Sequence, residues 1–416
     1  MKKQPSQLKR QQFRLSFSLY LNYVVHGFGL LILSQNMTAL GQAWNSPLKI
    51  VSFVISGIGI GRLLAYLITG YLSDRLSRKF FVYLGMACYF AFAVGIPFSK
   101  NIYFAYFLAI LAGIANSALD AGTYTTFAEM SAGGRGNILL KAVVSVGEFI
   151  LPLLVSAINL NHAWFGISFM TMAALLAINA CLLAPLKFPE PVKVQNSQLK
   201  LALAKGSKKE QAKRMLVTVC FAFYGYASMA LMIWFPQWIT LFGKAQGLST
   251  AVSHLELSLY SVGSIIGVIV LFSLLGRGVS DKKILVGMNL GATAMIAVLL
   301  TNQTPVVCEL ACLAFGFTAA SGVMQTGLNA FMHLYPARKG LATGVFYFFG
   351  ALASFTVPII TGILSDAGVR AAFGGDLVVG LIATCLTLAI SLLLKDIHLP
   401  ELTISSHQPE SLAKDQ

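Results

Sequence analysis

Long apolar runs recur from one end of this chain to the other, and they constrain the fold more than any other feature. Twelve runs can be marked, and each holds about 20 residues or more, the length an α-helix needs to cross ~30 Å of hydrocarbon. A soluble domain carries about 25% charged residues, whereas this chain of 416 residues carries 11% and is 56% apolar. The sequence therefore predicts an all-α membrane protein with twelve transmembrane helices. The runs cover residues 14–38, 48–71, 80–98, 103–129, 138–160, 163–186, 215–242, 253–276, 283–300, 305–333, 339–363 and 374–395.

One long polar connection, residues 187–214, interrupts the series after the sixth run. It divides the chain into two six-helix bundles over 14–186 and 215–395, flanked by polar segments at 1–13 and 396–416. The two halves also align weakly with each other, at an offset of about 205 residues. In that alignment Asp120 corresponds to Gln325, and Glu148 corresponds to Ser354. The sequence therefore predicts two pseudo-symmetric bundles made by duplication of one six-helix unit.

The basic residues fix the orientation of the chain in the membrane. Twenty-five of the 30 Lys and Arg residues fall in the segments on one side of the predicted spans, four fall on the other side, and Arg62 lies within a span. Because basic loops stay in the cytoplasm, both termini are predicted to be cytoplasmic. The same distribution accounts for the net charge of +15, so we expect a lipid bilayer and no nucleic acid as partner.

The turn between the second and third runs reads Gly-Tyr-Leu-Ser-Asp-Arg-Leu-Ser-Arg-Lys, from Gly70 to Lys79. Its basic residues, Arg75, Arg78 and Lys79, suffice as a topology signal. They do not explain Asp74, the acidic residue in this short turn.

This turn, the two halves and the basic linker resemble the major facilitator superfamily, with Ser77 where that family usually has glycine. The resemblance implies a carrier that works by alternating access. It also implies that the turn is a gating motif, with Asp74 bracing the N-terminus of the eleventh helix near Gly340. The runs Ser56–Arg62 and Gly113–Asp120 look more narrowly like enterobacterial inner-membrane carriers linked to quinate- or shikimate-like acids. The glycine and proline patterns of many exporters are missing from the fourth and fifth helices.

Three charged residues lie deep within predicted spans, where a charge costs at least ~2.5–3.5 kcal/mol. Arg62, Asp120 and Glu148 each lie about ten residues from a cytoplasmic helix end, roughly 13–15 Å deep at 1.5 Å per residue. Equal depth on three helices predicts a mutual cluster. In one interpretation Arg62 only neutralises a carboxylate and pins the helices together. In the other, Asp120 or Glu148 exchanges a proton while Arg62 binds the anion of a substrate.

Polar stripes on other helices complete the predicted site. Helical spacing places His26 on one face with Asn22, and Asp120 on one face with Asn116. The resemblance implies that the first, fourth, seventh and tenth helices surround the cavity. The predicted substrate-binding residues are Asn22, His26, Arg62, Asn116, Asp120, Tyr224, Gln325 and Asn329.

Two further expectations concern the second half. Pro236 should break or kink the seventh helix near its outer end. Glu256, Glu309 and Asp376 lie near predicted outer ends, where solvation would explain them.

Together these patterns predict a secondary transporter that takes up a small organic acid with protons. A sugar or polyol symporter, an exporter of drugs or metabolites, and a transporter-like nutrient sensor are the alternatives. An enzyme is not expected, because the sequence shows no nucleophile triad, metal cluster or phosphate loop. We expect a monomer in the bacterial inner membrane, without a cofactor or a metal.

Overall fold

The structure is a computed structural model that describes residues 5–72, 77–130, 135–189, 208–302, 304–335 and 339–396. Within these ranges every regular element is helical and no strand occurs. The N-terminal half comprises α1 (Pro5–Gln35), α2 (Met37–Ala43), α3 (Leu48–Leu72), α4 (Arg78–Phe98), α5 (Ile102–Met130), α6 (Arg135–Leu160) and α7 (Gly166–Leu183). The C-terminal half comprises α8 (Lys208–Ala245), α9 (Thr250–Gly276), α10 (Asp281–Thr301), α11 (Pro305–Ala319), α12 (Val323–Leu334), α13 (Lys339–Leu364) and α14 (Val369–Leu393), with short 3-10 turns η2 (Ser365–Ala367) and η3 (Leu394–Asp396).

Twelve segments of the described chain are long and apolar enough to cross a membrane, which confirms the predicted number of spans. The short α2 is not one of them, and α11 and α12 together form the tenth span, Pro305–Leu334. The all-α architecture follows from the bilayer itself, where backbone groups must find their hydrogen-bond partners within each spanning segment.

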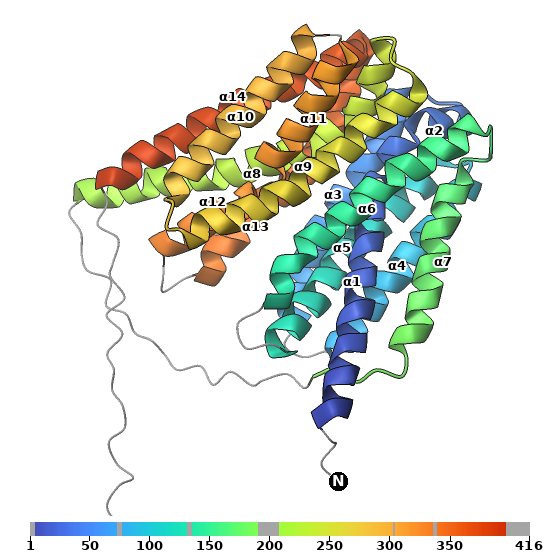
Figure 1. The fold of residues 1–416 in the computed structure, drawn as a ribbon, viewed down its shortest axis with the longest axis horizontal. Coiled ribbons are helices and arrows are strands. Elements are labelled where there is room, and N and C mark those ends of the chain that lie inside the picture. Colours follow the sequence, from blue (N-terminus) through green and yellow to red (C-terminus); the bar gives the residue numbers. More distant parts are fainter. Residues whose placement is uncertain are drawn as a thin grey trace, which may run out of the picture.

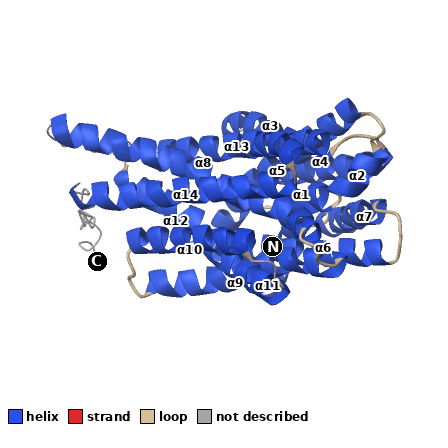
Figure 2. Cartoon of the chain, turned by 90° about the horizontal axis from the view of Figure 1, so that it is seen from above, coloured by secondary structure: helices blue, strands red, loops and turns tan. Residues whose placement is uncertain are grey.

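The two halves form separate helix bundles that lean against each other (Figure 1). Most of the contact between them comes from α3 with α13 and from α6 with α9, and α1 also packs against α8. The view from above shows α3 and α13 side by side (Figure 2). The starts of α1 and α8 lie apart at the lower and left sides of Figure 1, and the halves converge toward the opposite end.

Two predicted boundaries shift because helices extend beyond the membrane-spanning runs. α1 already begins at Pro5, inside the segment predicted as a polar terminus, and α8 begins at Lys208, inside the predicted linker. Residues 190–207 of the linker and residues 397–416 of the tail lie outside the described residues. The division into domains therefore stays a prediction at these ends.

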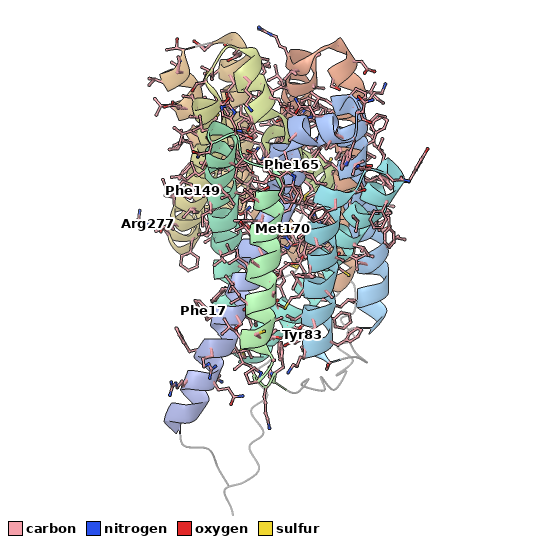
Figure 3. All side chains as sticks on the ribbon, turned by 90° about the vertical axis from the view of Figure 1, so that its right-hand side faces the viewer. Phe17, Tyr83, Phe149, Phe165, Met170 and Arg277 are labelled. Carbon is pink, nitrogen blue, oxygen red and sulfur yellow. The ribbon has the colours of Figure 1, made fainter. Side chains whose placement is uncertain are left out.

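The outer surface of both bundles is rich in apolar side chains, as expected for a face against lipid. Phe17 on α1 is 55% exposed, and Ile269 on α9 is 63% exposed. Figure 3 shows Phe17 pointing away from the bundle near the start of α1. The polar residues that the structure buries therefore lie between helices, where they need partners.

A close glycine contact sets the position of the helices that carry Arg62 and Asp120. Gly61 on α3 and Gly113 on α5 pack directly against each other's backbones. A Cβ on Gly113 would meet the carbonyl oxygen of Ile58, and one on Gly61 would meet that of Ile110. Small residues allow this approach in membrane helices, and it brings the two sequence runs of the narrower resemblance together.

A break interrupts the tenth span near its middle, whereas Pro236 does not break the seventh. α11 ends at Ala319, and α12 begins at Val323 after Gly322, whose φ of 96° lies in the left-handed region that glycine tolerates. α8 continues through Pro236 to Ala245. The seventh helix is therefore continuous through Pro236, and the tenth span is interrupted at a glycine.

Candidate functional site

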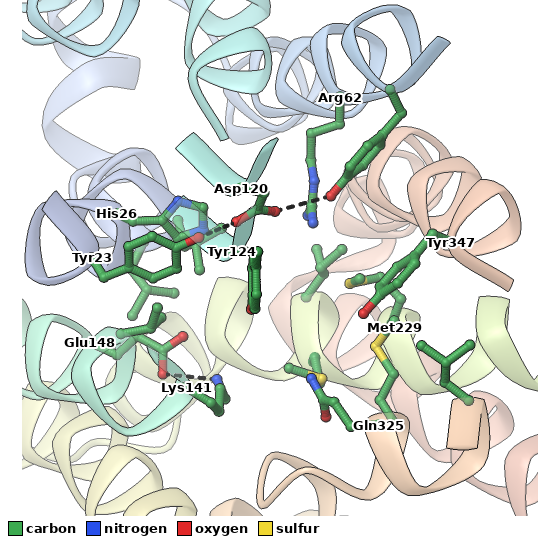
Figure 4. Close-up of a pocket in the computed structure, with 18 of the residues that line it drawn as sticks. Tyr23, His26, Arg62, Asp120, Tyr124, Lys141, Glu148, Met229, Gln325 and Tyr347 are labelled. Carbon is green, nitrogen blue, oxygen red and sulfur yellow. Dashed lines mark hydrogen bonds and ion pairs between the residues drawn. The ribbon is translucent and has the colours of Figure 1, made fainter. Parts of the chain in front are cut away.

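A cavity of about 530 Å³ lies between the two halves. Its lining comes from both: α1, α3, α5 and α6 on one side, and α8, α12 and α13 on the other (Figure 4). Its volume falls within the range of small-molecule sites, about 300–1,000 Å³. The charged lining residues are Arg62, Asp120, Lys141 and Glu148.

Arg62 and Asp120 lie together on one wall of the cavity. Asp120 accepts a hydrogen bond from the hydroxyl of Tyr23 at 2.6 Å and another from that of Tyr66 at 3.2 Å. Arg62 interacts with Tyr66 through a hydrogen bond and with Asp120 electrostatically. Figure 4 shows Arg62 and Asp120 on the same side of the cavity. Arg62 also reaches the other half, since its Nη1 donates to Ser354 Oγ at 3.3 Å.

Glu148 lines the same cavity but has a different cation. Its Oε2 lies 3.6 Å from Nζ of Lys141, and it accepts a hydrogen bond from Ser145 Oγ at 3.2 Å. The predicted cluster therefore divides into two sites, Arg62 with Asp120 and Lys141 with Glu148 (Figure 4). Each site combines one cation with one carboxylate.

Several buried polar atoms of the lining have no partner among the described residues. They include Nε of Arg62, Nδ1 of His26 and Oε1 of Gln237. Leaving such a group unpaired costs about 1–3 kcal/mol. The cavity lining therefore combines polar atoms that lack a protein partner with a guanidinium, a group that suits an anion.

Four predicted binding residues lie outside the cavity lining. Asn22 accepts a hydrogen bond from Asn179 Nδ2 at 2.7 Å, and Asn116 accepts one from the Tyr89 hydroxyl. Tyr224 accepts one from Asn289 Nδ2 at 3.1 Å, so all three join helices within one half. Asn329 is exposed on α12. Gln325 and His26, in contrast, do line the cavity.

Lys141 and the four tyrosines of the lining, Tyr23, Tyr66, Tyr124 and Tyr347, were not predicted as site residues from the sequence. Helical spacing holds a signal for three of them: Tyr66 follows Arg62 by four residues, Tyr124 follows Asp120 by four, and Lys141 precedes Glu148 by seven. Each pair shares a helix face, and all these residues line the cavity. Tyr347 on α13 carries no comparable signal.

Glu256 and Asp376 correct the expectation that solvation explains the acids of the second half. Glu256 is 1% exposed and Asp376 is 0% exposed. Each lies about two turns from the start of its helix, Glu256 in α9 and Asp376 in α14, and both helices pack against α8. Neither residue lines the cavity. Within the described residues, no group of three His, Cys, Asp or Glu side chains is placed to hold a metal ion.

One end of the interface, which we call the closed end, is joined by hydrogen bonds between the halves. Gln35 donates from Nε2 to Thr240 Oγ1 at 3.0 Å, and its Oε1 lies 2.8 Å from His254 Nδ1. Lys49 forms an ion pair with Asp366 at 2.5 Å. The cavity therefore lies between this sealed end and the ends from which α1 and α8 start.

The predicted gating motif, Gly70–Lys79, is described in part. Ser77 caps α4, because its Oγ accepts a hydrogen bond from the Phe80 N–H at 3.3 Å, a role that serine fills well. Lys79 donates to the carbonyl oxygens of Ala184 and Leu186 after the end of α7, at 2.9 and 3.3 Å. Gly70 lies in α3 and Arg78 begins α4, whereas Asp74 and Arg75 lie outside the described residues. The brace by Asp74 stays a prediction.

Comparisons with known proteins agree with this architecture. The family model described as "Major Facilitator Superfamily" matches residues 19–358. The inner membrane transport protein YdiM of Escherichia coli is 37% identical over 388 residues, which cover 92% of this chain and 95% of that protein. A gallate transporter of Pseudomonas putida is 21% identical over 365 residues, covering 80% of each chain.

Solved structures show the same fold. The D-xylose-proton symporter superposes with a TM-score of 0.72 at 15% sequence identity, covering 93% of this chain and 98% of the other. The chain therefore belongs to the major facilitator superfamily. It is a multi-pass membrane transporter rather than an enzyme.

Proposed function

We propose that this transporter takes up a small organic acid together with protons. The observation that carries the proposal is Arg62, a cation about halfway along α3 that lines the cavity with an unpartnered Nε. Placing a charge there costs at least ~2.5–3.5 kcal/mol, and a carboxylate ligand would offset that cost. Asp120 and Glu148 are the proposed proton-coupling residues, since each lines the cavity beside a cation.

The remaining lining favours an acid that carries a ring. Tyr23, Tyr66, Tyr124 and Tyr347 supply hydroxyl groups and aromatic faces, and four methionines supply an adaptable apolar surface. Gallate, the ligand named for one relative, is an acid of this kind. We therefore propose hydroxylated ring acids, of the quinate, shikimate or gallate type, as the substrate class.

We further propose that the closed end faces outward and the termini lie in the cytoplasm of a bacterial inner membrane. The excess of basic residues on the side of the termini supports this orientation. Relatives such as YdiM are named inner membrane transport proteins. Because one chain supplies both walls of the cavity, we propose a monomer as the transporting unit.

Uptake into proteoliposomes tests the function. Labelled shikimate, quinate and gallate would be offered with an imposed proton gradient, acidic outside, with D-xylose as the neutral comparison. We expect accumulation of an acid that a protonophore abolishes. Accumulation of D-xylose alone would favour the sugar symporter. Accumulation of a solute only when the inside of the proteoliposomes is acidic would favour an exporter.

A further inference from the structure

A chain of three hydrogen bonds leads from Glu148 in the cavity to the break in the tenth span. Ser145 Oγ lies 3.2 Å from Glu148 Oε2 and 3.1 Å from Ser264 Oγ. Ser264 Oγ in turn donates to the carbonyl oxygen of Ala320 at 2.9 Å. Ser145 is on α6 and Ser264 on α9, so the middle link crosses from one half to the other. Both serines are fully buried.

This chain of hydrogen bonds ends at a backbone carbonyl group in the break of the tenth span. Ala320 is the C-cap of α11, and the last carbonyl groups of a helix have no partner within that helix. The Ser264 hydroxyl supplies one for Ala320. Met324 and Gln325, in the first turn of α12 beyond the break, line the cavity. A change at Ser264 would therefore reach residues that face the substrate.

Counting protons shows that this chain depends on the state of Glu148. A hydroxyl has one proton to donate. When Glu148 is ionised, the two serines hold two protons for three links, so one link lacks a proton. When Glu148 is protonated, its O–H donates to Ser145, Ser145 donates to Ser264, and Ser264 donates to Ala320. Only the protonated carboxyl completes all three hydrogen bonds.

We propose that Ser145 and Ser264 are positioning residues that transmit the protonation of Glu148 to the break in the tenth span. Glu148 takes its proton from water in the cavity, and the serine hydroxyls only rotate, so no proton leaves them. Protonation then holds the halves together through α6 and α9 and steadies the start of α12. Ionisation of Glu148 removes one of the three hydrogen bonds and favours separation of the two halves between α6 and α9. The inference rests on the proposed proton coupling and assigns it to a particular route.

The groups around Glu148 define what competes with this route. Lys141, on the same helix, pairs with the ionised form at 3.6 Å. His26 on α1 and Asp120 on α5 line the same cavity, and Tyr260 on α9 interacts with Glu148 from the C-terminal half. α7 carries no charged residue. Lys141 and Ser145 therefore both contact Oε2 of Glu148, so the ion pair competes with the hydrogen bond that starts the serine chain.

Hydrogen exchange in a double-mutant design tests the route without a substrate or a pH gradient. Glu148→Gln places a neutral amide, which can donate an N–H to Ser145, where the protonated acid would stand. At about pH 8 we expect backbone exchange in residues 320–326 of the purified protein to be about tenfold slower in this variant than in the wild type. Ser264→Ala, and independently Ser145→Ala, should each abolish that slowing.

Ser258→Ala is the matched control. Ser258 also lies on α9 and also makes a hydrogen bond to α6, because its Oγ donates to the Phe149 carbonyl at 3.1 Å. It is not part of the hydrogen-bond chain from Glu148 to Ala320. The slowing caused by Glu148→Gln should persist in this background. Equal slowing in the Ser264→Ala and Ser145→Ala backgrounds, or none in Glu148→Gln itself, would overturn the proposal. A failure of uptake in proteoliposomes would instead overturn the proposed function and leave this result standing.

Discussion

The two halves share one architecture but give the cavity different chemistry. Arg62, Asp120, Lys141 and Glu148 all come from the N-terminal half, whereas the C-terminal half contributes neutral side chains such as Gln325. In the alignment of the two halves, a neutral residue corresponds to each carboxylate: Gln325 to Asp120, and Ser354 to Glu148. Ser354 even accepts a hydrogen bond from Arg62.

If the two halves arose by duplication of one unit, as their weak alignment predicts, their chemistry has since diverged. Under the proposed function, charge recognition and proton exchange belong to the N-terminal wall, which carries all four charged lining residues, and the C-terminal wall offers a neutral surface. The acids that the C-terminal half does bury, Glu256 and Asp376, lie away from the cavity. The predictions below break or sharpen this contrast, from the largest expected effect to the smallest.

Removing the guanidinium from the N-terminal wall should have the largest effect. We expect Arg62→Gln to weaken binding of an organic acid about 100-fold, because a charged hydrogen bond to the carboxylate is lost. A neutral amide analogue of the acid should bind with nearly unchanged affinity. Isothermal titration of the purified protein with both ligands measures this. Equal losses for the two ligands would assign Arg62 a purely structural role.

The second-largest effect is expected from a substitution in the glycine contact between α3 and α5, which positions Arg62. Gly113→Ala adds a Cβ against the backbone of Ile58 and Arg62 and should cost about 1–3 kcal/mol of stability. Gly287→Ala in α10 is the matched control, since its Cβ meets nothing within 4 Å. Thermal unfolding in detergent compares the two variants. A similar shift in both would show that the α3–α5 contact has no special importance.

A substitution on the C-terminal wall should weaken ligand binding less, and to the same extent for charged and neutral ligands. Gln325→Ala removes neutral hydrogen bonds worth about 0.5–1.5 kcal/mol, so binding should weaken by about 3- to 10-fold. The acid and its neutral analogue should lose affinity alike, in contrast to Arg62→Gln. A selective loss for the acid would place anion recognition in the C-terminal half as well.

The buried acids of the C-terminal half should have the smallest effect on transport. Asp376→Asn and Glu256→Gln each keep the side-chain shape, and neither position lines the cavity. We expect the dependence of uptake on external pH to stay within about twofold of the wild type in both variants. A flattened pH profile in either one would show that the C-terminal half takes part in proton coupling.

Most of the fold could be predicted because the bilayer leaves few solutions for such apolar runs. The twelve spans and the family follow from run length, basic turns and the Gly70–Lys79 motif. The break at Gly322 was not predicted, because the tenth span, Pro305–Leu334, is apolar throughout and was interpreted as one helix. Pro236 drew attention to the seventh span instead, although a membrane helix tolerates proline.

The site was predictable by depth but not by direction. Equal depth predicted that Arg62, Asp120 and Glu148 would lie together, and all three line one cavity, although Glu148 pairs with Lys141. Depth alone does not say which face of a helix turns to a neighbour in the same half. Asn22, Asn116 and Tyr224 therefore looked like ligand-binding residues, whereas they join helices within their own halves.

Proton uptake on ligand binding tests the central claim most directly. The purified protein would be mixed with an excess of the transported acid in weakly buffered solution containing a pH indicator. We expect about one proton to be taken up per ligand bound in the wild type and in Glu256→Gln, and none when Asp120→Asn and Glu148→Gln are combined. Uptake that persists in the combined variant, or disappears in Glu256→Gln, would contradict the division of chemistry between the halves.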